Sequence, residues 1–355
     1  MRTYLDHNAT TPLCPEARAA MQAAMDVVGN PSSVHAEGRA ARGIIERARA
    51  QVAALIGCDP HDIVFTSGAT EAASLWLRGR AALLGAAVEH DAVLCWIEGC
   101  SEPMLVPVDA QGQVIAGADV TLSCLQGANS ETGVVQSALG KRPVGMSDVT
   151  QLIGKVGFDF STSWTEAVIL SAHKFGGPKG VGALVLNKGV DPVSAGGGGG
   201  QELGRRPGTE NVIGIAGFGA AAEVAARDLV DGVWDGVAQL RDILETALEA
   251  GSPGTILVGK TGPRLPNTSC ILTPGWKGET QVMQMDLAGF AVSAGSACSS
   301  GKVRASRVLL AMGYDAVAAS SAIRVSLGRH TLMEEVLRFG DAWVAQSRKF
   351  RLRAA

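Results

Sequence analysis

Apolar and polar positions follow two different periods along the first two thirds of the chain. Between Arg39 and Ile56, apolar residues recur at helical spacing opposite Arg and Glu, which predicts an amphipathic helix that ends at Gly57. Short apolar runs typical of buried strands occur at 63–65, 93–97, 120–125, 167–170 and 181–186. Helical or glycine-rich segments separate these runs. Strands that alternate with helices predict an α/β fold with a largely parallel sheet covered on both faces.

The pattern changes near Val233. A long polar–apolar helix is predicted over Val237–Leu248, and the shorter alternations that follow indicate a second, smaller domain. Just before it, 217–222 matches a dinucleotide-binding fingerprint. The segment that precedes this match is short and broken by Gly214, so we predict a packed helix over 216–226 and no bound dinucleotide.

The glycine run at 196–200 is too rich in glycine for a regular element. A flexible linker is one interpretation. Backbone that closely approaches a ligand or a partner chain is the other, and the charged residues that follow favour it.

Composition narrows the class of protein. The 355 residues suffice for about two domains, and 46% hydrophobic with 18% charged residues is typical of a well-packed globular chain. The net charge of −3 argues against nucleic acid or an anionic membrane as the main partner. We find no run of about 18 apolar residues and no signal peptide, and we therefore expect a cytoplasmic protein without a membrane span.

Cysteine and histidine spacing predicts no metal site. The seven cysteines contain no C-x-x-C pair, which indicates reduced thiols in a cytosolic protein, most of them buried. The six histidines show no ligand spacing.

The segment 66–71, between a predicted strand and a predicted helix, is a candidate anion site. Backbone N–H groups at a helix start that Gly68 opens and Thr70 caps can bind a phosphate. Many strand–helix turns share this composition, so the turn alone is weak evidence.

Lys174 directly follows the predicted strand 167–170 within Ser171-Ala172-His173-Lys174. Burial beyond a strand end disfavours the charged form of a lysine and frees its amine for a Schiff base. A surface lysine in a β-turn is the alternative, and the compact S-A-H-K-F-G-G-P-K-G string argues against it.

Cys298 lies in a segment of small residues, 293–301. Such a composition suits an exposed, mobile loop, which a reactive thiolate needs. A cysteine buried in a tight turn is the alternative at this point.

Taken together, these strings resemble those of the cysteine desulfurases of the NifS/IscS type, within the class-V aminotransferase-like enzymes of fold type I. The resemblance covers nearly the whole chain. The matching segments, in order, are 4–12, 29–35, 66–71, 89–93, 131–136, 171–174, 208–211, 295–300 and 323–328.

The resemblance implies a pyridoxal 5′-phosphate enzyme with a role for each matched residue. Lys174 forms the internal aldimine and moves protons at the substrate Cα. Asp148 pairs with the ring nitrogen, Gln151 with the phenolic oxygen, and His90 stacks on the ring, while Ser130 replaces an asparagine that the family has at the ring edge. The residues implied at the phosphate are Ala69, Thr70, Ser171, His173 and, from the other subunit of a homodimer, Thr209. Arg324 is the implied clamp for the substrate carboxylate.

The resemblance also implies the reaction and the architecture. L-cysteine is converted to L-alanine, and its sulfur passes to Cys298 as a persulfide for an acceptor such as an iron–sulfur scaffold protein. The large domain, 12–232, is expected to hold a mostly parallel seven-stranded sheet flanked by helices. Residues 1–11 and 233–355 are expected to form a small α+β domain that carries the Cys298 loop.

Two other functions remain open at this point. A selenocysteine lyase or another class-V enzyme would keep the cofactor and change the substrate. A degenerate paralogue that acts as a binding partner is supported only by Ser130 and by shortened segments after Thr70 and Glu131.

Overall fold

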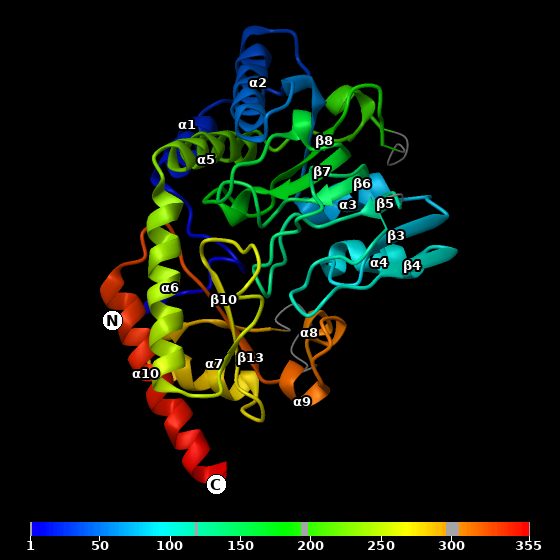
Figure 1. Cartoon of the computed structure of the whole chain (residues 1–355). Helices are drawn as coiled ribbons and strands as arrows, with labels where there is room; N and C mark the ends of the chain where they lie inside the picture. The colour runs from blue at the N-terminus through cyan, green and yellow to red at the C-terminus, as the bar shows by residue number, and fades with distance from the viewer. Residues whose placement is uncertain (1, 118–119, 193–197, 296–304, 355) are drawn as a thin grey trace.

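The computed structural model describes residues 2–117, 120–192, 198–295 and 305–354. A large sheet forms its main layer (Figure 1). Its seven strands are β2 (Ile63–Thr66), β3 (Ala82–Ala86), β4 (Glu102–Val106), β5 (Leu122–Cys124), β6 (Val144–Asp148), β7 (Thr165–Ser171) and β8 (Gly182–Leu186). The strand order is β2-β8-β7-β6-β5-β3-β4, and all neighbouring pairs are parallel except those that involve β8.

Helices bury both faces of this sheet. One face packs against α1 (Pro15–Met25), α2 (Ala36–Ile56) and α5 (Val212–Val230), and the other packs against α3 (Ala69–Leu77) and α4 (Asp91–Gly99). Along β7, Val168 and Leu170 belong to the first core, and Ala167 and Ile169 belong to the second. Burial on both sides explains why the central strands read as continuous apolar runs. The predicted α/β class is confirmed.

A second, antiparallel sheet lies beside the first. Its order is β12 (Ser293–Ala294), β13 (Ala322–Ser326), β10 (Thr268–Leu272), β9 (Ile256–Leu257), and β1 (Thr3–Tyr4) pairs separately with β11 (Phe290–Ala291). Figure 1 shows α6 (Val233–Gly251) and α10 (Met333–Ala354) side by side along this sheet, with α7 (Gly278–Leu287) near its base. The short helices are α8 (Arg307–Ala311), α9 (Ala316–Ala319), η1 (Pro60–Asp62), η2 (Phe160–Thr162), η3 (Ala172–Lys174) and η4 (Gln201–Gly204). The domain boundaries at 12 and 233 stay a prediction.

Most predicted elements are present, and one is wrong. The run 93–97, predicted as a strand, lies inside α4, whose N-cap His90 accepts a hydrogen bond from the Ala92 N–H at 3.1 Å. This helix buries Val93, Leu94 and Ile97. Its sequence is therefore as apolar as that of a buried strand. A run this short does not distinguish the two structures by periodicity.

The fingerprint at 217–222 lies within α5, as the packed-helix interpretation predicts. A Cβ on Gly219 would come within 2.5 Å of Ala48 Cα, so this glycine allows α5 to pack closely against α2. Among the described residues, no helix is long and apolar enough to cross a membrane.

Candidate active site

A cavity of about 260 Å³ lies at the carboxyl ends of β6 and β7, where Asp148 and Ser171 are the last residues of their strands. Parallel α/β sheets place their binding sites at this edge. The cavity collects ten of the predicted residues: Ala69, Thr70, His90, Ser130, Asp148, Gln151, Ser171, His173, Lys174 and Arg324. The amino-terminal segment adds Asn8 and Ala9.

Lys174 reaches the cavity from η3, directly after β7. Its Nζ donates hydrogen bonds to the carbonyl oxygens of Asn8 at 2.8 Å and Ala9 at 2.9 Å. The side chain is half-buried. The amine is therefore held at the cavity by backbone acceptors of a segment more than 160 positions away in the sequence.

The predicted anion turn is present, but its cap differs from the prediction. Helix α3 begins at Ala69 after Gly68, whose φ of 159° belongs to the N-cap, and Thr70 lies in the first turn and does not cap the helix. Gly68 has no side chain to cap the helix. The Oγ atom of Ser171, at the end of β7, accepts the Ala69 N–H at 2.8 Å instead. The backbone of the cap packs against Gly182, where an added Cβ would lie 2.7 Å from Gly68 Cα, so this close approach requires glycine at position 182.

His173 lies beside this turn in a neutral state. Burial, and secondarily the positive charge of Lys174, lowers the pKa of His173 to about 4. Its Nδ1 lies 3.1 Å from Thr10 Oγ1. A neutral imidazole offers one N–H donor at physiological pH.

Asp148 and Gln151 occupy the turn that follows β6. The Oδ1 atom of Asp148 accepts the Thr150 N–H at 2.9 Å. The Gln151 amide donates through Nε2 to the Asn8 carbonyl oxygen at 2.9 Å and accepts from Lys155 Nζ through Oε1 at 3.1 Å. Asn8 thus has one carbonyl oxygen that accepts from both Gln151 and Lys174.

Arg324 enters from β13 of the second sheet. Its Nη2 forms an ion pair with Asp6 Oδ1 at 2.7 Å, and its Nη1 donates to the Ser130 carbonyl oxygen at 2.9 Å. Its buried Nε has no hydrogen-bond partner among the described residues. A guanidinium has five N–H groups, so hydrogens remain for a bound carboxylate.

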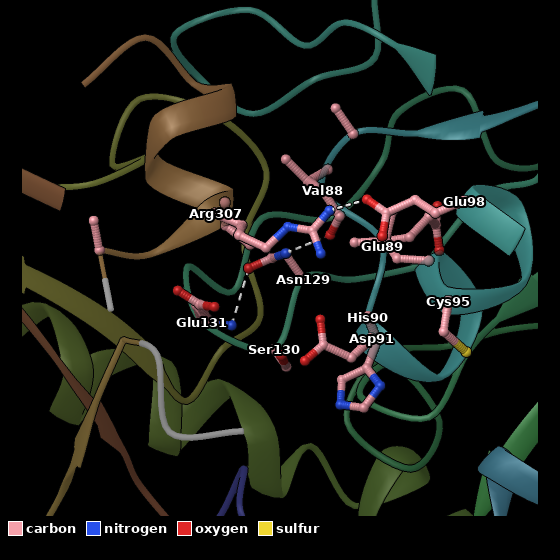
Figure 2. A pocket seen from close by; sticks show the side chains of 14 residues that line it. Val88, Glu89, His90, Asp91, Cys95, Glu98, Asn129, Ser130, Glu131 and Arg307 are labelled. Atoms are coloured by element: carbon pink, nitrogen blue, oxygen red, sulfur yellow. Dashed lines mark hydrogen bonds and ion pairs between the residues drawn. The ribbon is translucent and has the colours of Figure 1, made fainter. Parts of the chain in front are cut away.

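His90 and Ser130 also line a second cavity, of about 360 Å³, whose residues are drawn in Figure 2. Figure 2 shows Arg307 reaching across this cavity to Glu98 on α4, with which it forms an ion pair. Burial raises the pKa of Glu89 to about 8 and that of Glu131 to about 7. Glu131 Oε2 accepts a hydrogen bond from Ser306 Oγ at 2.5 Å.

Two predicted residues are absent from the lining of the 260 Å³ cavity, as far as the structure describes it. Thr209 is exposed and lies outside it, and its predicted contact with a partner subunit stays a prediction. Cys298 lies outside the described residues. Gly295, at the near end of that undescribed stretch, donates its N–H to the Ala322 carbonyl oxygen at 3.3 Å.

Three buried residues of this region, Asn8, Gln126 and Lys155, have no role that the sequence predicts. Asn8 lies within the segment 4–12, and Lys155 follows Gln151 by four positions. Neither residue type nor spacing indicates that these two residues belong to the site. Gln126 lines the cavity, and its buried Nε2 has no hydrogen-bond partner in the described part of the chain. Only the folded chain identifies such an atom.

Comparison with known proteins assigns the class. The family model described as aminotransferase class-V matches residues 3–339, and the chain therefore belongs to this family. Within it the chain groups with the cysteine desulfurases. A cysteine desulfurase of Cereibacter sphaeroides is 40% identical, over 94% of this chain and 93% of its own length. An IscS-like cysteine desulfurase of Mycobacterium tuberculosis is 36% identical, over 99% of this chain and 98% of its own.

A solved structure agrees with this assignment. The crystal structure of a NifS-like protein from Rickettsia africae superposes with a TM-score of 0.89 at 29% identity, over 98% of this chain and 100% of that one. The resemblance predicted from the sequence is confirmed, and so is the seven-stranded fold.

Proposed function

We propose that this enzyme binds pyridoxal 5′-phosphate and removes sulfur from L-cysteine, producing L-alanine and a persulfide on Cys298. The main support for this proposal is the position of the Lys174 amine. It lies at a cavity that is also lined by the carboxylate of Asp148, the start of α3 and Arg324. The relatives named cysteine desulfurase support the choice of substrate.

The residues present fit the cofactor. Among the described residues, Gln126 Nε2 and Arg324 Nε are buried donors without a hydrogen-bond partner. Buried donors are normally satisfied, and the acceptor oxygens of a ligand in this cavity would satisfy them. The start of α3 and the Ser171 hydroxyl suit a phosphate, and the carboxylate of Asp148 suits a protonated ring nitrogen. Lys174 is the amine that would hold the cofactor's aldehyde carbon.

When bound, pyridoxal phosphate supplies an electron sink that makes the substrate Cα acidic and polarises the C–S bond. The chain's own groups do the rest. Arg324 binds the substrate carboxylate, Lys174 carries the Cα proton, and His90 is placed at the same cavity for proton transfer. Asp148 would keep the ring nitrogen protonated. Ser130, whose side chain is shorter than that of asparagine, would contact the ligand through a water molecule.

The transfer of sulfur needs no added oxidant, because the substrate carbon takes up the electron pair of the broken C–S bond. The Cys298 thiolate bonds to the substrate sulfur as the C–S bond breaks, the bonding electrons go to the substrate carbon, and a proton completes alanine. Cys298 now carries a persulfide and passes its outer sulfur to an acceptor. For this acceptor we propose a protein such as an iron–sulfur scaffold.

We propose a homodimer in which Thr209, exposed in the single chain, contacts the phosphate in the partner's cavity. The cytoplasmic location stays a prediction. No observation favours selenocysteine lyase or a binding-only paralogue, since the cavity contains Lys174, Asp148 and His90 and the relatives are named cysteine desulfurases.

The decisive experiment measures alanine and sulfide from the purified, cofactor-loaded protein with L-cysteine and a thiol reductant. Equal amounts of both products are expected. Lys174→Ala should lose the visible absorbance that borohydride abolishes in the unmodified enzyme. Cys298→Ser should stop sulfide release and keep the cysteine-induced spectral change.

Cys58→Ser is the matched control, because burial raises the pKa of Cys58 to about 12 and makes it an inert thiol. A Cys298→Ser enzyme that forms persulfide at the normal rate would exclude Cys298 as the sulfur carrier. A protein that does not become coloured with pyridoxal phosphate would refute the proposal as a whole.

A further inference from the structure

Lys155 is a buried lysine that has no carboxylate partner among the residues that the structure describes. It is 3% exposed, and in the described part of the chain it makes no ion pair within 4.0 Å. Burial, followed by the nearby charges of Lys174 and Arg324, lowers the pKa of Lys155 to about 7. Burying an amine without a charged partner costs free energy, and the hydrogen bonds of the amine have to offset this cost.

In the described part of the chain, both hydrogen bonds of the Lys155 side chain go to one residue. Its Nζ donates to the Gln151 carbonyl oxygen at 3.0 Å and to the Gln151 side-chain Oε1 at 3.1 Å. The backbone directs it there, because Gly154 has a φ of +75° immediately before it. A Cβ on Gly154 would lie 3.0 Å from Ala225 Cβ and 3.2 Å from Phe175 Cβ, which makes this a glycine position.

The contact determines which way the Gln151 amide faces. The two ends of an amide have nearly the same shape, so only their hydrogen-bond partners distinguish them. Lys155 Nζ offers hydrogens to Oε1, and the Asn8 carbonyl oxygen accepts from Nε2 at 2.9 Å. The two partners thus select the same orientation. That same Asn8 oxygen accepts from Lys174 Nζ at 2.8 Å.

We propose that Lys155 is a positioning residue that acts through Gln151. It holds the amide with its NH₂ group toward Asn8 and the cavity, where that group donates to an oxygen of the cofactor. The inference rests on the proposed function, because the acceptor is an atom of pyridoxal phosphate. It assigns a role to a residue that does not line the cavity itself.

The test is a double-mutant cycle of Lys155→Met, Gln151→Met and their combination, with the dissociation constant for pyridoxal phosphate and the pH profile of its visible absorbance as readouts. Lys155→Met should bind the cofactor up to about tenfold more weakly, the equivalent of one hydrogen bond, and should shift the absorbance profile. Gln151→Met should do the same. The double variant should resemble Gln151→Met alone, because Lys155 then has nothing to position.

Lys188→Met, at an exposed lysine, is the matched control and should leave both readouts unchanged. Gln151→Glu keeps the acceptor for Lys155 and removes the NH₂ group, so it should weaken binding with Lys155 in place, even if Lys155→Met does not fold. Unchanged binding in Lys155→Met or in Gln151→Glu, or effects that multiply in the double variant, would overturn the inference. If the unmodified protein remains colourless, the proposed function itself fails, and the two failures are distinguished.

Discussion

Asp6 and Arg324 form an ion pair of 2.7 Å although 318 positions separate them in the sequence. The Arg324 side chain is 6% exposed, and that of Asp6 is 17% exposed. Asp6 is itself fixed, since its Oδ2 accepts from Ser293 Oγ at 2.8 Å. The carboxylate therefore orients the guanidinium that is predicted to bind the substrate.

We expect Asp6→Asn to weaken the binding of L-cysteine. The variant loses the charged partner that orients Arg324, and hydrogen bonds to charged groups are the stronger ones, so KM should rise by roughly tenfold while kcat changes less. Steady-state kinetics measure both constants. Asp286→Asn, which breaks the exposed pair with Arg2, is the control with unchanged KM. An unchanged KM in Asp6→Asn would show that Arg324 needs no orienting carboxylate.

A second ion pair predicts a loss of stability. Arg49 and Glu202 pair at 2.7 Å with side chains 9% and 2% exposed, and Glu202 also accepts the Phe65 N–H at 2.9 Å. Glu202→Ala should lower the free energy of unfolding of the apoprotein by about 3 kcal/mol, because the buried Arg49 loses the carboxylate that pairs with both of its terminal nitrogens and, among the described residues, keeps only the more exposed Glu46 as a charged partner. Urea denaturation measures this change.

The matched control for that prediction is Glu16→Ala. It breaks the exposed pair with Arg227 and should cost less than about 1 kcal/mol. Equal losses in the two variants would mean that burial does not decide the contribution of the Arg49–Glu202 pair.

Glu89 predicts how stability depends on pH. Its pKa rises from 4.5 to about 8 on folding, because burial disfavours the charged form. Its contribution is present in full below 4.5 and is lost as the pH rises toward 8, because the unfolded chain releases this proton first. Glu89→Gln removes the titration, so it should be more stable than the unmodified protein above about pH 8, by up to a few kcal/mol, and similar at about pH 5. Parallel stability curves for the two proteins across this range would contradict the prediction.

We expect Gln126 to lower the stability of the apoprotein and to raise its affinity for the cofactor. Its buried Nε2 has no partner among the described residues, and an unsatisfied buried donor costs about 1–3 kcal/mol. Gln126→Met should therefore stabilise the apoprotein and weaken its affinity for pyridoxal phosphate. Thermal unfolding with and without the cofactor measures both effects. A variant that is less stable without the cofactor would show that the amide already has a protein or water partner.

Local letter patterns already predict much of the fold. The strand before Lys174, the helix that ends at Gly57, and the packed helix through Gly217 are local features, since burial on two faces or on one stripe leaves a period in the sequence. The same reasoning was wrong at 93–97, where five apolar letters fit a buried helix as well as a strand. Ten of the predicted site residues line one cavity, but local composition marks only those at 69–70 and 171–174, and the others were assigned through the resemblance to a known family.

The remaining features depend on contacts between distant segments. Asp6 with Arg324, Asn8 with Lys174, and Arg49 with Glu202 are pairs that no spacing in the sequence indicates, because each joins different layers of the fold. Lys155 has the letters of an ordinary surface lysine, and only the turn at Gly154 directs it to Gln151. The residue types thus carry the chemistry of this enzyme, and tertiary packing sets their protonation, orientation and partners, because burial and distance exist only in the folded chain.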